Sequence, residues 1–530
     1  MRRRPDPTAR ARRPGRGRPP RRPEVPPTAL RGLLAGLLSG GLTLGVGTLL
    51  ASFVTRSADP VLGVGQEFIA RTPEWLKEWA IRQFGQSDKA VLLGSLYATL
   101  VVLFAVVGLV AVRWLRAALV LVAVLGAAAI GATAHRPDAT ALSWVPSTVG
   151  TLAGAAALVL LVRAVRRGAA GGRGTRSLSR RSVLFGAVAG TAAVTAGAGT
   201  VVNRSHSVAA TRAGIRLPAP ASPAAALPAG VDPTEGITPY VTSAKDFYRV
   251  DTALSVPQVD VSTWSLRIHG MVEREVTVTF EDLLGEDLHE RWMTMTCVSN
   301  EVGGNLAGNA RWLGVPLTTL LDRAGIADGA DMLFSTSVDG FTVSTPLAEA
   351  TDGRDSMIAI GMDGEPLTDV HGFPARMIVP GLYGFVSACK WITDVEVTRF
   401  DAKTAYWTDR GWAPQAPIKT ATRIDVPASF AKVASGRTVP VAGVAWAQTR
   451  GISRVEVSVD DGEWVEATLV PTVNPSTWVQ WTYAWDGAEP GNHTVRARAT
   501  DGTGQLQTQD VVKPIPDGSS GWPSKFFTVT

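Results

Sequence analysis

The chain has 530 residues and a formal net charge of +6, with only two cysteines and six histidines. Two cysteines exclude an iron–sulfur cluster held by this chain's own thiolates, and no Cys-x-x-Cys-His motif offers a site for covalent haem. His135 is the single histidine of the apolar region up to residue 202, which excludes a haem held by two histidines between its helices. The length predicts several domains, and we expect neither haem nor an iron–sulfur cluster in this chain.

Residues 1–28 form a tail dominated by Arg and Pro, in which Asp6 and Glu24 are the acidic residues. Such a composition cannot bury a core and predicts disorder. A cytoplasmic tail that orients the first helix and contacts anionic lipid is favoured over a nucleic-acid-binding arm, so no nucleic-acid partner is expected.

A membrane domain is predicted over residues 29–202. Its five apolar segments are each close to the roughly 20 residues that cross a bilayer, and they cover residues 29–54, 90–112, 117–134, 144–164 and 182–202. The loop from Val162 to Arg181 contains seven arginines, whereas the loops 55–89 and 135–143 have no comparable basic excess. The positive-inside rule therefore predicts a multi-pass protein of the cell membrane whose second half lies outside the cytoplasm.

Two shorter patterns lie within or beside this domain. Glu67–Gly85 has the pattern of an amphipathic helix lying at the membrane interface. Ser179–Phe185 (SRRSVLF) resembles a twin-arginine export signal placed inside the chain, although paired arginines before a membrane helix are also an ordinary topology signal.

Residues 203–236 are predicted to form an extracytoplasmic linker. Its segment Leu217–Gly230 is rich in Pro and Ala and has no core-forming pattern. We expect an extended, fairly stiff spacer that sets the following domain away from the membrane.

Residues 237–419 predict a mixed α+β domain. Residues 262–272 and 274–280 alternate in the manner of strands, Asp282–Leu284 begins a short helix, and a second helix opens with Pro316. Asp339-Gly340 is a hairpin signal between two β-rich runs.

Residues 420–530 have strand patterns every 8 to 12 residues, separated by turn signals. This spacing predicts a β-sandwich.

The residues that carry chemistry belong to the α+β domain. Cys297 lies in the run TMTCVSN, and HGFPARMIVPG (His371–Gly381) is followed closely by SACKW (Ser387–Trp391). A soft thiolate suits a thiophilic metal, and Arg with Lys suits a phosphate. By themselves these residues leave two plainer interpretations open, a buried structural cysteine or a Cys297–Cys389 disulfide.

Taken together, these motifs resemble the sulfite oxidase family of molybdopterin enzymes. The resemblance extends from about Tyr240 to the C-terminus and implies a molybdenum–molybdopterin cofactor, with Cys297 as the metal ligand. It also implies that the β-sandwich is the family's immunoglobulin-like dimerisation domain, so a homodimer is a further expectation. The residues that it implies for catalysis are Cys297, Asp339 and Phe341, and those for binding the cofactor are Phe247, Tyr248, Arg249, Asn300, Asp339, His371, Arg376, Ser387 and Lys390.

Three departures from the family pattern concern the substrate. Asp251 stands where sulfite oxidases have a histidine, Phe341 where an active-site tyrosine is expected, and Ser265 where an arginine helps to bind sulfite. Loss of a cation and a phenol removes natural partners of a dianion, although Arg267 or Arg311 could restore an anion site. The Phe247–Val250 run resembles the bacterial periplasmic branch of the family, which is similar to methionine-sulfoxide reductases. This resemblance favours reduction of a neutral S-oxide or N-oxide, on a small molecule or a protein.

The alternatives are a sulfite oxidase-like dehydrogenase and, with less support, a metal-free surface binding protein. In either enzyme, electrons must pass through a separate partner, such as a cytochrome or a quinone-linked protein. The membrane helices then serve as an anchor or a docking surface.

Overall fold

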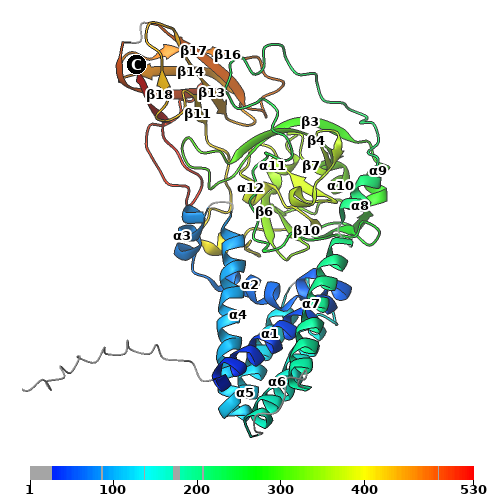
Figure 1. The fold of residues 1–530 in the computed structure, drawn as a ribbon. Coiled ribbons are helices and arrows are strands. Elements are labelled where there is room, and N and C mark those ends of the chain that lie inside the picture. Colours follow the sequence, from blue (N-terminus) through cyan, green and yellow to red (C-terminus); the bar gives the residue numbers. More distant parts are fainter. Residues whose placement is uncertain (1–26, 85–86, 137, 171–179, 206–207, 487–488) are drawn as a thin grey trace, which may run out of the picture.

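The computed structural model describes residues 27–84, 87–136, 138–170, 180–205, 208–486 and 489–530. Long helices occupy one end of the molecule, a mixed α+β domain lies in the middle, and a β-sandwich lies at the other end (Figure 1). This order is the one predicted from the sequence.

Five helices in the described part of the chain are long and apolar enough to cross a membrane, which confirms the five predicted segments. The helices of this end are α1 (Pro27–Val54), η1 (Arg56–Ala58), α2 (Pro60–Arg71), α3 (Glu74–Phe84), α4 (Asp88–Arg113), α5 (Leu115–Ala134), α6 (Val145–Ala170) and α7 (Arg180–Ser205). Glycines let α1 and α4 approach closely: a Cβ on Gly36 would lie 2.0 Å from the Phe104 carbonyl oxygen.

The amphipathic helix predicted over Glu67–Gly85 is wrong as a single element. The chain forms α2, then breaks at Thr72-Pro73, and resumes as α3. Proline lacks an N–H and disfavours helical geometry in the residue before it, which accounts for the break. Asp59 begins α2 by accepting hydrogen bonds from the backbone N–H groups of Val61 and Leu62, at 2.9 and 3.1 Å.

Some predictions fall outside the described residues. Residues 1–26 of the predicted tail lie outside them. So do residues 171–179 of the arginine-rich loop, which include Ser179. Arg180 and Arg181 lie in the first turn of α7.

The Pro/Ala segment Leu217–Gly230 is extended, but it does not hold the next domain away from its neighbours. After α8 (Val208–Gly214) it runs beside strand β3 (His289–Thr296), where the Ser222 N–H donates to the Leu288 carbonyl at 3.2 Å and the Ser222 carbonyl accepts from the Glu290 N–H at 2.8 Å. Trp292 Nε1 also donates to the Ala225 carbonyl at 2.9 Å. The spacer prediction is therefore wrong, because polar backbone groups of the segment find partners on a sheet edge.

The central domain contains two sheets. The first has the order β2-β1-β10-β5-β6 and the second the order β3-β4-β7-β8, with β9 paired to β7. The further strands are β1 (Ser265–Gly270), β2 (Val276–Thr279), β4 (Ala307–Pro316), β5 (Met332–Ser337), β6 (Thr342–Pro346), β7 (Met357–Met362), β8 (Glu365–Pro366), β9 (Arg376–Ile378) and β10 (Ile392–Thr398), and the helices are α9 (Phe280–Leu284), α10 (Leu317–Ala324), α11 (Leu347–Thr351), η3 (Asp369–His371), α12 (Gly384–Ser387) and η4 (Thr408–Arg410).

Local predictions for this domain are confirmed. The short helix at Asp282 is α9, the helix after Pro316 is α10, and Asp339-Gly340 joins the antiparallel strands β5 and β6. Helix α10 buries its apolar face, with Leu317, Leu320 and Leu321 all fully inaccessible to solvent.

The C-terminal part is a β-sandwich of two sheets, as predicted, with strand orders β11-β13-β17-β16 and β12-β19-β18-β14-β15. Its strands are β11 (Ala421–Val426), β12 (Lys432–Val433), β13 (Val439–Trp446), β14 (Ile452–Val459), β15 (Val465–Glu466), β16 (Thr468–Leu469), β17 (Val479–Trp485), β18 (Gly491–Asp501) and β19 (Ser524–Val529). Val444, Trp446 and Trp478 belong to the same apolar core as the central domain. The sandwich therefore packs firmly on the central domain within one chain.

Candidate active site

A cavity with an empty volume of about 890 Å³ lies in the central domain. The predicted site residues that line it are Phe247, Tyr248, Cys297, Asp339, Phe341, His371, Arg376 and Lys390. Residues from widely separated parts of the sequence thus meet around one space.

Cys297 directly follows β3 and begins a tight loop. Its N–H donates to the Leu306 carbonyl at 2.9 Å, and its carbonyl accepts from the Asn300 N–H at 3.0 Å. Burial raises the pKa of the Cys297 thiol, and hydrogen bonds with Ser299 partly offset that rise. Cys297 and Cys389 are both buried and unpaired, so the alternative disulfide is not formed.

The loop after Cys297 is held from the β-sandwich side. Ser519 Oγ donates to the Asn300 carbonyl at 2.5 Å, and Arg423 donates to the Gly304 carbonyl at 3.1 Å. Gln448 Nε2 donates to the Thr294 carbonyl at 3.0 Å, at the end of β3. The position of the thiol therefore depends on the C-terminal domain.

Asn300 and Ser387, two of the predicted cofactor contacts, have side chains that bond to backbone and do not line the cavity. The Asn300 side chain accepts from the Leu306 N–H at 2.8 Å and so closes the cysteine loop. The Ser387 hydroxyl donates to the carbonyls of Leu382 and Tyr383, at 3.0 and 3.1 Å. Both side chains shape the backbone around the cavity, and neither points to a ligand.

Arg376, in β9, is a buried cation with 5% of its surface exposed. One terminal nitrogen donates to the His371 carbonyl at 3.2 Å, while Nε has no hydrogen-bond partner. No carboxylate forms an ion pair with it in the part of the chain that the structure describes. Burial lowers the pKa of Arg376 to about 10, and a guanidinium in such surroundings is suited to an anionic ligand.

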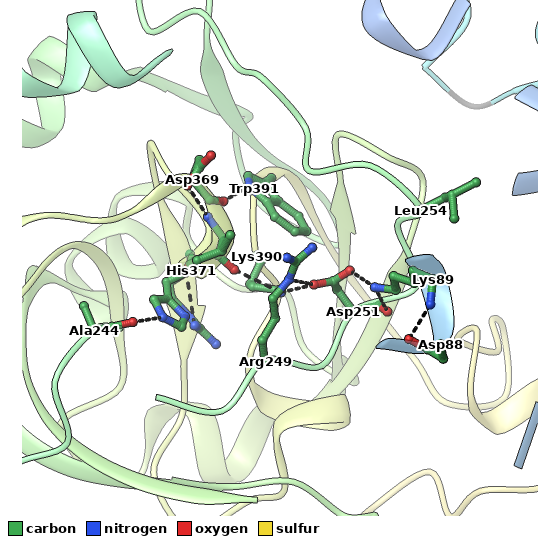
Figure 2. A network of polar contacts seen from close by, with 12 residues as sticks. Asp88, Lys89, Ala244, Arg249, Asp251, Leu254, Asp369, His371, Lys390 and Trp391 are labelled. Atoms are coloured by element: carbon green, nitrogen blue, oxygen red, sulfur yellow. Dashed lines mark hydrogen bonds and ion pairs between the residues drawn. The ribbon is translucent and has the colours of Figure 1, made fainter. Parts of the chain in front are cut away.

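His371, at the end of η3, lies beside Arg376. Its Nε2 donates to the Ala244 carbonyl at 2.7 Å, which requires a proton on Nε2 (Figure 2). Burial lowers the pKa of His371 to about 4, and the charge of Arg376 contributes to this shift.

Lys390 and Arg249 both contact one carboxylate, that of Asp251. Lys390 Nζ lies 3.0 Å and Arg249 Nε 2.8 Å from Asp251 Oδ2 (Figure 2). Burial lowers the pKa of Lys390 to about 8, although Asp251 opposes that change. Arg249 itself does not line the cavity, so its predicted contact to a cofactor is replaced in this structure by the ion pair with Asp251.

Phe247 and Tyr248 stack on each other, with ring centroids 5.2 Å apart. Phe247 also contacts the His371 ring edge to face at 5.6 Å. Burial raises the pKa of Tyr248 well above its usual range, with a smaller contribution from Cys297, so the phenol stays protonated.

The hairpin between β5 and β6 brings Asp339 and Phe341 to the cavity. Asp339 Oδ1 accepts from the Phe341 N–H at 3.3 Å. Burial raises the pKa of Asp339, and the charge of Asp251 adds to the rise.

An aromatic wall, formed by Phe341, Phe385, Tyr406, Trp407 and Trp412, was not predicted from the sequence. Consecutive ring centroids from Phe341 through Tyr406, Trp407 and Trp412 to Phe385 lie between 5.1 and 6.1 Å apart. All of these residues except Tyr406 line the cavity. The signal was present in the run AYWTDRGW, whose aromatic residues follow the last strand of the domain.

Residues considered for an anion site lie elsewhere. Arg311 pairs with Glu290 at 3.2 Å and Arg267 with Glu275 at 2.6 Å, and neither lines the cavity. Ser265 starts β1, where it pairs with Thr279. Ser265 therefore lies away from the cavity, whereas Phe341 lines it.

The residues present fit a molybdopterin cofactor. A buried thiol, an unpaired guanidinium and an ammonium face one enclosed space. The thiol matches a thiophilic metal, and the two cations match a phosphate. Cys297 would hold the metal, and Arg376 with Lys390 would hold the phosphate-bearing part.

Comparison with known proteins agrees with this reading. Residues 253–407 match the family described as oxidoreductase molybdopterin binding domain, and residues 421–497 match a bacterial Ig domain. The chain is 29% identical over 153 residues to the uncharacterized oxidoreductase YuiH of Bacillus subtilis, an alignment covering 29% of this chain and 74% of that protein. It is 31% identical over 281 residues to mitochondrial sulfite oxidase of Mus musculus, covering 44% of this chain and 50% of that one.

The sulfane dehydrogenase SoxCD of Paracoccus pantotrophus is similar over 55% of this chain and 83% of that chain, with 22% identity and a TM-score of 0.47. The chain spans about half the length of the mouse sulfite oxidase that it matches. The family matches coincide with the cavity-bearing domain and with the sandwich. The chain therefore contains a molybdopterin-binding oxidoreductase domain, similar to that of the sulfite oxidases, followed by an Ig-like domain.

Proposed function

We propose that this protein is a membrane-anchored enzyme that removes an oxygen atom from a neutral S-oxide or N-oxide outside the cytoplasm. The observation that carries this proposal is the aromatic wall, which meets the cavity of Cys297. A neutral, partly apolar oxo-compound suits such a wall better than a small dianion.

Several residues of the cavity have separate roles in this proposal. Cys297 is the metal ligand, and Arg376 and Lys390 bind the phosphate of the cofactor. His371, Phe247 and Tyr248 contact its ring system. When bound, the cofactor supplies oxygen-atom transfer, while the protein supplies binding and electrostatics.

The charge count of the cavity argues against sulfite. Among the described lining residues, Arg376 and Lys390 are the Arg and Lys side chains, and the proposal assigns both to the cofactor. Each missing charge-assisted hydrogen bond to a dianion is worth about 1.5 to 3 kcal/mol, or roughly one to two decades in binding. Sulfite is thus expected to be a poor substrate.

Asp339 is the proposed proton donor. Reduction of an S-oxide consumes two electrons and two protons and releases water, so the site needs an acid near the departing oxygen. Asp339 lines the cavity beside Phe341, and burial raises its pKa toward the range in which a carboxyl group can donate a proton.

Steady-state assays on one metal-loaded preparation test the substrate class. Sulfoxide or N-oxide reduction is followed with a reduced viologen dye, and sulfite oxidation with an artificial electron acceptor. We expect efficient reductase activity and weak sulfite turnover. Efficient sulfite turnover without any reductase activity would overturn the proposal.

A second candidate is sulfite oxidation, which the similarity to the mouse sulfite oxidase favours. The metal-free binding protein has less support, because both cysteines are unpaired and the cations Arg376 and Lys390 face the cavity.

The location and export route are part of the proposal. The five apolar helices and the arginine-rich loop support a catalytic domain outside the cytoplasm, reached by twin-arginine export. Arg180→Lys combined with Arg181→Lys keeps both charges, so it should preserve topology but block twin-arginine export. Normal surface levels of the double variant, measured by protease accessibility in whole cells, would make the pair a topology signal only.

Two partners complete the proposal. Electrons come from a separate cytochrome or quinone-linked protein that docks beside the membrane helices. A homodimer, expected from the family resemblance, is tested by light scattering of the detergent-solubilised protein. A monomeric mass would contradict it.

A further inference from the structure

A lysine from the membrane part of the chain reaches the cofactor site. Lys89 lies in the first turn of α4, and its Nζ is 2.5 Å from Asp251 Oδ1 and 2.9 Å from the Asp251 carbonyl (Figure 2). These residues are 162 positions apart in sequence. The contact therefore joins two parts of the molecule that have different tasks.

Asp251 is the centre of a cluster of one anion and three cations. Its side chain is 3% exposed; Oδ1 faces Lys89, and Oδ2 faces both Lys390 and Arg249. Burial alone would raise the pKa of Asp251, but Lys390, Lys89 and Arg249 together lower it well below its usual range. The carboxylate is thus ionised, and its charge is shared between the two sides.

The contact is held by further bonds from α2, which with α3 forms the segment between α1 and α4, here named the outer segment. Gln66, in α2, donates from Nε2 to the Thr252 carbonyl at 3.0 Å and accepts from the Leu254 N–H at 2.8 Å. Gly65 lies against Leu254, where a Cβ would come within 2.5 Å of Leu254 Cδ2. Helices α2 and α4 of the membrane part therefore both contact residues 251–254, which lie beside the cavity.

The charge arrangement has a consequence for phosphate binding. Without Lys89, the Asp251 carboxylate would hold Lys390 and Arg249 more tightly and would repel a nearby phosphate. With Lys89 bound to Oδ1, part of that negative charge is compensated from outside the catalytic domain. Lys390, which lines the cavity, then keeps more of its positive charge for the ligand.

We infer that Lys89 is a positioning residue of the cofactor site, which neutralises Asp251 and so leaves Lys390 available to the cofactor's phosphate. This role rests on the proposed function, because it requires that Lys390 binds the cofactor. It makes the membrane part a component of the catalytic site in addition to an anchor.

The test is the amount of pterin and molybdenum that stays with full-length protein after extended dialysis. Pterin is measured as its fluorescent oxidation product released by denaturation, and molybdenum by mass spectrometry. Lys89→Gln should retain about tenfold less of both than the wild type. Lys89→Arg keeps the charge and should retain wild-type amounts.

A double variant separates charge from simple docking. Lys89→Gln combined with Asp251→Asn removes the cation together with the anion that it neutralises, so retention should return to the wild-type level. If the contact only docked two domains, the double variant would be as poor as Lys89→Gln. Lys77→Gln, which removes a lysine of the outer segment 6.0 Å from the Tyr406 ring centroid, is the matched control and should leave retention unchanged.

Each outcome decides the inference. Wild-type retention in Lys89→Gln, no rescue in the double variant, or an equal loss in Lys77→Gln would overturn it. Wild-type protein without any pterin would instead overturn the proposed function on which it depends. Cofactor in the wild type, loss in Lys89→Gln and recovery in the double variant would support both.

Discussion

Two buried charges in this molecule have opposite surroundings. Asp501, in the β-sandwich, has a fully buried side chain and accepts hydrogen bonds from Arg450 Nε at 2.8 Å, Thr420 Oγ1 at 3.0 Å and Thr503 Oγ1 at 2.7 Å. Arg376, in the cavity, is nearly as buried, yet its Nε has no partner. The protein's own hydrogen bonds satisfy the Asp501 carboxylate. The Arg376 guanidinium keeps an unused donor, Nε, for a ligand.

This difference separates structural charges from ligand-binding ones. A satisfied buried charge stabilises the fold only through its partners, and breaking the set leaves an uncompensated charge. An unsatisfied buried charge lowers the stability of the fold, and a bound anion offsets that loss. Asp251 lies between these cases, since its partners come from the cavity and from the membrane part.

The largest expected effect concerns the metal ligand. Cys297→Ser replaces a soft thiolate with a hydroxyl that is rarely ionised, so turnover in the viologen assay should be lost. Cys389→Ser is the matched control, because Cys389 is also buried and unpaired but does not line the cavity. Full activity of Cys297→Ser would contradict its role.

Arg376→Met tests the unsatisfied side of the comparison. Loss of its charge-assisted bonds should lower pterin retention by about one to two decades. Removing an unpaired buried cation should leave the free energy of unfolding of the cofactor-free protein unchanged or higher. A strongly destabilised variant would show that Arg376 is a structural charge like Asp501.

Asp501→Asn tests the satisfied side. Breaking this set should cost about 3 kcal/mol of stability, measured by urea denaturation of the full-length protein in detergent. Pterin content per folded chain should stay at the wild-type level. A loss of cofactor without a loss of stability would show that Asp501 serves ligand binding and not the stability of the fold.

The pH dependence of that variant provides a check. Burial alone would raise the pKa of Asp501, but hydrogen bonds from Thr503, Arg450, Gln505 and Thr420 lower it well below its usual range. A carboxyl group with a depressed folded-state pKa stabilises the protein above the unfolded-state pKa of about 3.9. The stability difference between wild type and Asp501→Asn should therefore be constant near neutral pH and shrink as the pH falls below about 4. A stability difference that grows as the pH falls would contradict the lowered pKa of Asp501.

The smallest expected effect is at the aromatic wall. Phe341→Tyr adds one phenol to the cavity, and a single neutral hydrogen bond changes binding by roughly threefold to tenfold. Sulfite turnover should rise within that range, and sulfoxide reduction should change little. A rise of several decades would mean that Phe341 alone excludes sulfite.

Sequence patterns predicted the elements whose signal is local. The five membrane helices, α9, α10, the β5–β6 hairpin and the sandwich strands all follow from periodicity and turn residues. The break between α2 and α3 could also have been predicted, because Pro73 is visible in the sequence.

Motifs predicted the site only in part. Cys297, His371, Arg376 and Lys390 do meet in one cavity, as the family resemblance implied. The roles of Asn300 and Ser387 depend on how their loops close, since each side chain bonds to backbone within six residues. Lys89 has no local signal at all, because its contact arises only when distant segments pack together.

The molybdenum and pterin content of purified full-length protein, compared with that of Cys297→Ser, tests most directly whether this cavity holds the cofactor. We predict about one molybdenum and one pterin per chain in the wild type, with the metal lost in the variant. Wild-type protein that contains neither, from cells shown to make the cofactor, would refute the proposed cofactor site.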